Sequence, residues 1–321
     1  MSLYTTPGLL IRDHPYNYTV NSSEECTLTT CSLLQAQYTY DPSLTGNAFV
    51  ASIFSLLLLL QLILGSYYRT IGFTIAMSCG LILEIIGYIG RVQMHFNPFI
   101  QQPFMMQLIC VTIAPVFFTA AIYLGLSRII VVYGTHLSLL LPGTIAISFM
   151  VSDFFSLLLQ AGGGAVVEIA NDVATERIGI HLTVAGLGLQ VASLGLLLLG
   201  CADFVRRCRG MGKVLSSVDA HQRIRRKGLF RSFLGGELVK KGLLFATLAI
   251  LTRSTYRIFE LQGGFHGKLW NSEVDFMVCD GTMVALASLC LTILHPGMAF
   301  HGYWDAANFK LKNKGFCGRG V

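Results

Sequence analysis

Seven long apolar stretches constrain what this chain can fold into more than any other feature of its sequence. The hydrocarbon core of a membrane is roughly 30 Å thick and a helix rises about 1.5 Å per residue, so one crossing needs about 20 mostly apolar residues. The stretches therefore predict seven transmembrane helices. They cover approximately residues 47–67, 70–90, 104–126, 142–166, 178–200, 242–261 and 276–294.

The stretches favour helices over the strands of a membrane barrel. Barrel strands are shorter and alternate between apolar and polar residues, whereas these stretches are long and uniformly apolar. A helix also satisfies its own backbone hydrogen bonds in lipid. The 321 residues are 53% hydrophobic and only 12% charged, which is outside the usual balance of a soluble domain. The predicted fold class is all-α, a polytopic membrane protein.

Basic residues are unevenly distributed between the segments that join the stretches. If the N-terminus is outside, the cytosolic segments contain Arg69, Arg128, the dense run from 206 to 241, and the run from 310 to 319. The outer segments then contain few basic residues and many acidic ones. The positive-inside rule therefore predicts an outer N-terminus and a cytosolic C-terminus.

This topology divides the chain into three parts. Residues 1–46 form a polar extracellular tail without the apolar core of a signal peptide, so the first stretch is expected to direct insertion. Residues 47–304 form the transmembrane domain, whose basic cytosolic loop at 203–241 is expected to meet anionic lipid headgroups. Nucleic-acid binding explains that loop less well, because topology already requires its charge. Residues 305–321 form a basic cytosolic tail.

The outer tail contains the candidate modification sites. Asn17 in NYT and Asn21 in NSS are glycosylation sequons, and they lie where the charge rule independently places the tail outside. Cys26 and Cys31 share this oxidising side and are a candidate disulfide, although two free thiols remain the alternative. The spacing of the nine cysteines suggests no metal site, and we expect no cofactor.

Charged side chains inside the predicted spans are the first candidates for function. A charge near the bilayer centre costs about 2.5–3.5 kcal/mol on insertion scales, so it normally faces a partner or a wet cavity. Glu84 and Arg91 are seven residues apart, as are Arg253 and Glu260 in the opposite order. Seven residues are two helical turns, about 10 Å along one face. If the two spans touch, Glu84 is expected to meet Arg253 or Arg257, and Arg91 to meet Glu260.

These charge pairs have two interpretations, a lock between helices and a substrate site. Tyr88 lies one turn from both Glu84 and Arg91 and adds a hydroxyl group, while Asp280 adds a buried acid in the seventh stretch. His295, with Pro296 after it, lies at the cytosolic end of that stretch and is interpreted as an end cap.

The fourth stretch, VSDFFSLLLQAGGGAVVE, joins polar residues to a weak helix former. Asp153 and Gln160 lie on one face, and each glycine from 162 to 164 costs up to about 1 kcal/mol relative to alanine. Transporters often build sites at such weakened helices, but close packing of small residues is the alternative. In the third stretch, Pro115 is expected to kink the helix because it removes a backbone hydrogen bond.

Five segments in order along the chain carry a family pattern: EIIGYIGR (84–91), AAIYLGLSRII (120–130), DFFSLLLQAGGG (153–164), RSTYRIFELQGG (253–264) and HPG (295–297). Together they resemble the fungal seven-helix RTA-like family of lipid-translocating exporters, which includes aminocholesterol-resistance and sphingoid long-chain base resistance proteins. The resemblance runs from about residue 47 to 304. It implies a plasma-membrane protein that moves amphipathic molecules or protects against them, and its family-type polar positions are Glu84, Arg91, Asp153, Gln160, Arg253, Arg257 and Glu260.

We interpret the chain as a translocator or exporter of amphipathic lipids such as sphingoid long-chain bases or aminosterols, and not as an enzyme. Glu84 or Asp153 would receive the cationic head, with membrane lipids as partners and no nucleic acid. The motif GxxxxGK[ST] does not occur, so a proton or lipid gradient would drive transport. The expected location is the plasma membrane, with an endomembrane as the alternative.

Two other function classes fit the sequence less well. A seven-helix receptor, or a regulator of lipid asymmetry without transport of its own, has the same topology, but no acid precedes Arg128 as a receptor signature would require. An intramembrane metal hydrolase needs several histidine ligands, and only His181 lies within a predicted span.

Overall fold

All regular secondary structure in the described part of the chain is helical, which confirms the predicted class for those residues. The structure is a computed structural model that describes residues 38, 40–133, 142–170, 172–212, 233–263, 267 and 269–297. Its helices are α1 (Leu44–Tyr68), α2 (Ile71–Phe96), α3 (Gln101–Tyr133), α4 (Pro142–Ile169), α5 (Val173–Gly212), α7 (Phe233–Gln262), α8 (Glu273–Asp275), η4 (Phe276–Thr282) and α9 (Met283–Ile293).

Six helical segments among the described residues are long and apolar enough to cross a membrane, so the chain is a multi-pass membrane protein. The predicted sixth span corresponds to α7, which is not among the six and which contains Arg253, Arg257 and Glu260. A seventh crossing by α7 therefore stays a prediction. The six segments are Leu44–Tyr68, Ile71–Phe96, Gln101–Ile130, Gly143–Val167, Val173–Asp203 and Glu273–Ile293.

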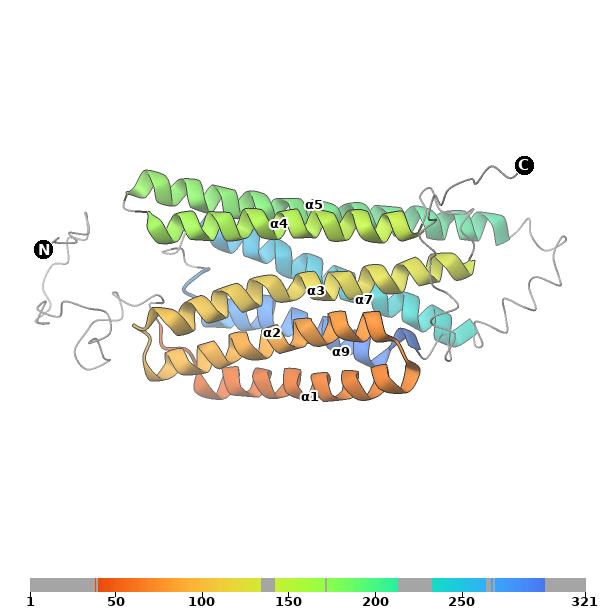
Figure 1. Cartoon of the computed structure of the whole chain (residues 1–321), viewed down its shortest axis with the longest axis horizontal. Coiled ribbons are helices and arrows are strands. Elements are labelled where there is room, and N and C mark those ends of the chain that lie inside the picture. Colours follow the sequence, from red (N-terminus) through yellow and green to blue (C-terminus); the bar gives the residue numbers. More distant parts are fainter. Residues whose placement is uncertain are drawn as a thin grey trace, which may run out of the picture.

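The long helices lie side by side along the long axis of the molecule (Figure 1). Their contacts close them into a ring. From α1 to α5 each helix packs against the next in sequence, α5 packs against α7, and α9 packs against both α7 and α1. Helices α3 and α7 also touch across the ring. We call the end of the bundle where α1 begins the Arg91 end, and the end where α9 finishes the His295 end.

Both ends of the predicted cytosolic loop at 203–241 are helical. Helix α5 continues to Gly212 and α7 already begins at Phe233, while residues 213–232 lie outside the described part. With 40 residues, α5 is longer than the roughly 20 that a bilayer crossing needs. It therefore extends beyond the apolar stretch that the sequence marked.

Apolar side chains cover the outside of the bundle as well as filling its interior. Leu59, Ile63 and Phe155 are each more than half exposed, as lipid-facing residues would be. Phe54 and Phe118 are fully buried in a core cluster to which α1, α2, α3, α5, α7 and α9 contribute. Because lipid leaves no reason to turn polar groups outward, the charged residues of the spans lie inside with this core.

Helix α4 continues without a break through the glycines at 162–164, and one of them permits a close helix contact. A Cβ added to Gly163 would lie 2.6 Å from both the carbonyl oxygen of Gly179 and the backbone nitrogen of Thr183 in α5, whereas a Cβ on Gly164 meets nothing within 4 Å. The structure thus supports the packing interpretation of this segment, as small residues allow helix backbones to approach in lipid.

We predict opposite effects for alanine at these two adjacent glycines. Gly163→Ala should lower the free energy of unfolding by about 1–3 kcal/mol, because backbone atoms must move to admit the methyl group. Gly164→Ala should be neutral or stabilise by up to about 1 kcal/mol through its better helix propensity. Thermal unfolding of both variants in detergent measures the difference, and equal melting temperatures would contradict it.

Candidate functional site

The nine residues predicted for a substrate or transport site all lie inside the bundle, and none is more than 5% exposed. The structure separates them into three groups. An outer cluster surrounds Arg91, and a lateral cluster connects Asp153 and Gln160. The central cluster contains Glu84, Tyr88, Arg253, Arg257, Glu260 and Asp280.

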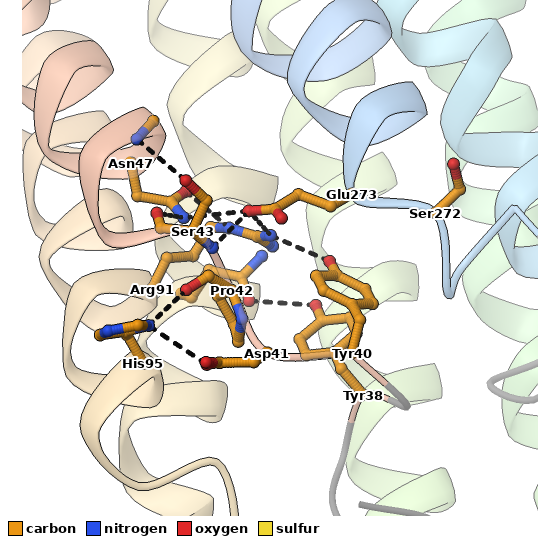
Figure 2. A network of polar contacts seen from close by, with 12 residues as sticks. Tyr38, Tyr40, Asp41, Pro42, Ser43, Asn47, Arg91, His95, Ser272 and Glu273 are labelled. Atoms are coloured by element: carbon orange, nitrogen blue, oxygen red, sulfur yellow. Dashed lines mark hydrogen bonds and ion pairs between the residues drawn. The ribbon is translucent and has the colours of Figure 1, made fainter.

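Arg91 is held by groups from three parts of the chain (Figure 2). Its Nε donates to Asn47 Oδ1 and its Nη2 donates to the Tyr40 hydroxyl, both at 2.9 Å. The guanidinium carbon lies 4.1 Å from the centre of the Phe276 ring, a cation–π distance. Its acidic neighbour is Glu273, whose Oε1 lies 4.0 Å from Nη2.

The predicted pairing of Arg91 with Glu260 is therefore wrong. It assumed that α2 and α7 pack side by side, but α1 and the last helical segment, α8 to α9, lie between them along the ring. Glu273, at the first turn of that segment, reaches Arg91 instead.

Residues 38 and 40–43, which precede α1, lie across the Arg91 end of the bundle. We call these residues the strap. The Ser43 backbone nitrogen donates to Glu273 Oε1 at 2.7 Å, and the Tyr38 hydroxyl donates to Gln107 Oε1 at 3.1 Å. Tyr38 also stacks on Trp270, with ring centres 5.5 Å apart. The sequence did not predict this strap, because these residues were assigned to the polar tail. The aromatic residues Tyr38, Tyr40 and Trp270 were the sequence feature that could have indicated it.

Burial keeps the strap phenols neutral. It raises the pKa of Tyr40 above its usual value, and the nearby Arg91 guanidinium partly opposes that rise. Burial raises the pKa of Tyr38 as well. Both phenols therefore keep their protons at physiological pH, so Tyr38 donates a hydrogen bond and Tyr40 accepts one from Arg91 as a neutral group.

The two arginines of α7 take acidic partners other than Glu84. Arg253 Nε lies 2.9 Å from Asp280 Oδ1, and Arg257 Nη1 donates to Glu260 Oε2 at 2.7 Å one turn along the same helix. The predicted contact of Glu84 with either arginine is therefore wrong. Both pairs are almost completely buried.

Glu84 is left without a hydrogen-bond partner in the described part of the chain. Both of its carboxyl oxygens are buried, and the nearby Tyr88 hydroxyl also lacks a partner there. Asp280, Arg253 and Arg257 are the charged groups that act on Glu84 electrostatically. Glu84 is thus a buried acid whose neighbouring cations are paired with other acids.

A π-helical turn brings Asp280 into this cluster. Residues Phe276–Thr282 form η4, with hydrogen bonds one residue longer than in an α-helix, and such turns often occur at functional sites. The Tyr88 hydroxyl contacts Gly281 so closely that no Cβ would fit there. A period of 3.6 residues does not predict this turn, so the partner of Asp280 was not visible in the sequence.

Asp153, in contrast, is fully supplied with donors. Thr119 and Tyr123 of α3 donate to its Oδ2 at 2.7 and 2.9 Å, and Ser193 of α5 donates to its Oδ1 at 3.0 Å. The carboxyl group therefore ties α3, α4 and α5 together through neutral hydroxyls.

Gln160 extends the lateral cluster along α4. Its Nε2 donates to Ser156 Oγ at 2.8 Å, and Ser156 Oγ donates to the carbonyl oxygen of Gly186 in α5 at 2.7 Å. The whole cluster has the arrangement of an interhelical lock.

His295 closes the opposite end of the bundle, as predicted for an end cap. The Gly297 backbone nitrogen donates to its Nδ1 at 3.0 Å, so this nitrogen carries no proton. The imidazole lies against the rings of Tyr68 and Phe73 and is completely buried. Burial lowers the pKa of His295 to about 4, so it is neutral at physiological pH.

The remaining predicted sites, Asn17, Asn21, Cys26 and Cys31, lie outside the described residues. Their glycosylation and disulfide stay predictions.

With this geometry in view, comparison with known proteins identifies the chain. The sequence profile described as RTA1 like protein matches residues 77–303. The chain belongs to the RTA1-like family. The central and lateral clusters and Arg91 lie within the matched region, whereas the residues of the strap precede it.

Curated members of the RTA1-like family share much of the chain's length. Sphingoid long-chain base transporter RSB1 of Saccharomyces cerevisiae is 36% identical over 285 residues, which cover 81% of this chain and 73% of the relative. Protoporphyrin uptake protein 1 of the same species is 30% identical over 67% of this chain and 65% of the relative. Protein RTA1 is 26% identical over 72% and 68%. No solved structure matches the chain.

We predict that Arg91→Lys destabilises the Arg91 end. Lysine keeps the charge but has no planar guanidinium to bond Asn47 and Tyr40 while it stacks on Phe276, so we expect a loss of about 1–3 kcal/mol in the free energy of unfolding. Thermal unfolding measures it. His95→Gln is the control, since the His95–Asp41 pair is about one-third exposed and should contribute less than about 1 kcal/mol. Equal losses for the two variants would contradict the assignment.

The buried His295 predicts an acid-sensitive fold. Its folded pKa lies below that of an unfolded histidine, so between pH 6.5 and about 4 the unfolded chain binds the extra proton. This contribution to stability is complete above pH 6.5 and is lost as the pH falls toward 4. The melting temperature in detergent should therefore fall less steeply over this range for His295→Asn than for the unmodified protein. Parallel curves would show that His295 does not titrate.

Proposed function

We propose that this RTA1-like protein translocates sphingoid long-chain bases, or closely related cationic amphipaths, and that Glu84 receives their ammonium group. The observation that carries the proposal is the buried Glu84 carboxyl group without a hydrogen-bond partner among the described residues. The support for the substrate class is the 36% identity to a protein named as a sphingoid long-chain base transporter.

The distribution of charge in the central cluster favours Glu84 as the binding acid. Arg253 has Asp280 and Arg257 has Glu260, so these four groups balance one another. A buried carboxylate that lacks both a cation and donors is strongly destabilised, and an arriving ammonium would supply both. Glu84 is therefore the acid in this cluster that gains most from a cationic ligand.

Asp153, the other acid that the sequence suggests as an acceptor of the ammonium group, is the less suitable candidate. Three hydroxyls already donate to its two oxygens, so an ammonium group would have to displace existing hydrogen bonds. We assign it a structural role in holding α3, α4 and α5 together.

The surroundings of Glu84 suit an amphipathic ligand. Tyr88 supplies a hydroxyl without a partner in the described part of the chain, which would bond to a hydroxyl of a sphingoid base. Glu84 itself is completely buried, so loading requires the helices to part. We interpret this arrangement as a closed state of an alternating-access cycle, in which a site inside the membrane is exposed to one side at a time.

The finer features of the proposal follow from the sequence. We propose that α7 is the seventh span, that the N-terminus is outside, and that the protein acts in the plasma membrane as an exporter giving resistance to these bases. Aminosterols share the cationic amphipathic character and are included as candidate substrates. Exchange of a proton for the ammonium group at Glu84 would couple transport to a pH gradient.

We predict that Glu84→Gln lowers the rate of sphingoid-base movement in proteoliposomes by roughly tenfold or more, the factor that corresponds to about 1.4 kcal/mol. Labelled base and labelled phospholipid should be assayed together, with and without a pH gradient. Gel filtration and thermal unfolding would verify that the variant folds.

Asp153→Asn is the matched acid-to-amide control. It should lower the melting temperature, because Asp153 connects three helices, while base movement per folded molecule changes little. The opposite pattern, with Asp153→Asn inactive and Glu84→Gln active, would reject Glu84 as the acceptor. If the unmodified protein moves no lipid at all, the receptor or regulator alternative is favoured.

A further inference from the structure

Pro115 leaves a gap in the hydrogen bonding of α3. The residue lies inside this helix, where the backbone N–H of position 115 would normally bond to the carbonyl oxygen of Val111. Proline has no N–H, so it cannot fill that bond. In the hydrocarbon core no water replaces it, and an unsatisfied carbonyl there costs several kcal/mol.

Arg253 of α7, on the other side of the ring, supplies the missing hydrogen-bond donor. Its Nη2 donates to the Val111 carbonyl oxygen at 2.6 Å. Its Nε lies 2.9 Å from Asp280 Oδ1 at the same time. One buried guanidinium thus joins α3 to the π-helical turn of the last segment, and it lies where α3 and α7 touch.

We infer that Pro115 is a positioning residue that keeps Arg253 away from Glu84, and that it thereby sets the preference for a cationic substrate. The inference rests on the proposed function, since it concerns how the same site stays open to an ammonium group. The hydrogen bond from Nη2 to Val111 orients the guanidinium, and the ion pair with Asp280 at Nε holds its charge on the side of the last segment.

The consequence of removing Pro115 follows from the same contacts. An alanine at 115 would restore the N–H that Val111 lacks, so the Val111 carbonyl oxygen would no longer depend on Arg253 for a hydrogen bond. Glu84 is a buried acid on which the charge of Arg253 already acts. The freed guanidinium would turn toward it, and a substrate amine would then compete with the protein's own cation.

The test compares Pro115→Ala with Pro103→Ala. Pro103 lies in the first turn of the same helix, where backbone N–H groups have no partner within the helix. Pro103→Ala therefore removes a proline from α3 without closing an internal gap. Proteoliposomes carrying each protein are given a sphingoid base and its N-acylated form, which has the same chain but no positive charge.

For Pro115→Ala we expect the rate ratio of base to N-acylated lipid to fall roughly tenfold or more, whereas Pro103→Ala should leave this ratio within about twofold. A purely structural effect of Pro115 would lower both rates together and keep their ratio. An unchanged ratio in Pro115→Ala would overturn the role of Pro115 in substrate preference.

A chemical readout separates the inference from the proposed function. A hydrophobic carbodiimide reacts with carboxyl groups in apolar surroundings and reacts poorly with carboxylates held in ion pairs. Mass spectrometry should find the adduct on Glu84 in the unmodified protein and in Pro103→Ala, and much less of it in Pro115→Ala.

The labelling result decides whether Pro115 keeps Arg253 away from Glu84, and the rate ratio decides whether this position sets the substrate preference. Equal labelling of Glu84 in all three proteins overturns the positioning role of Pro115, whatever the transport rates are. Reduced labelling in Pro115→Ala, combined with an unmodified protein that moves neither lipid, upholds that role and rejects the proposed function.

Discussion

The lack of water inside the bilayer is the constraint on which this structure depends. Every polar group in the spans has to find its partner within the protein, and the contacts of Arg253 show how far that requirement reaches. Pro115 leaves one backbone carbonyl oxygen of α3 without its helical N–H donor. Arg253 of α7 donates a hydrogen bond to that oxygen and also forms an ion pair with Asp280. The missing hydrogen bond in α3 is thus replaced by contacts that connect α3, α7 and the π-helical turn η4.

The same requirement explains the difference between the clusters. Asp153 accepts hydrogen bonds from hydroxyl groups of neighbouring helices. Arg91 bonds to an amide and a phenol, stacks on an aromatic ring and lies near a carboxylate. We interpret both residues as connections between helices. Glu84 departs from the pattern, because its neighbouring cations are held by other acids. In an RTA1-like protein, a buried acid kept free in this way suits a ligand that brings its own positive charge.

Much of the fold was readable from the sequence, but the pairing within the site was not. Uniformly apolar stretches of about 20 residues predict helices because the bilayer thickness sets that length. Glu84, Arg91 and Asp153 stand out for the energetic cost of a charge in lipid. Their partners depended on which helices are neighbours, and the expected pairing of α2 with α7 was wrong because α1 and the last segment lie between them along the ring.

The sequence by itself determined the helical class, most of the spans and the set of polar residues that must face inward, since these follow from the solvent properties of lipid. Only the tertiary structure decided that Arg91 meets Glu273, that residues before α1 cross the Arg91 end, and that Arg253 reaches Val111 and Asp280. The physical reason is that pairing depends on the order of helices around the ring and on a π-helical turn at Asp280. Neither leaves a periodic signal in the chain, so the isolation of Glu84 appears only when the helices are assembled.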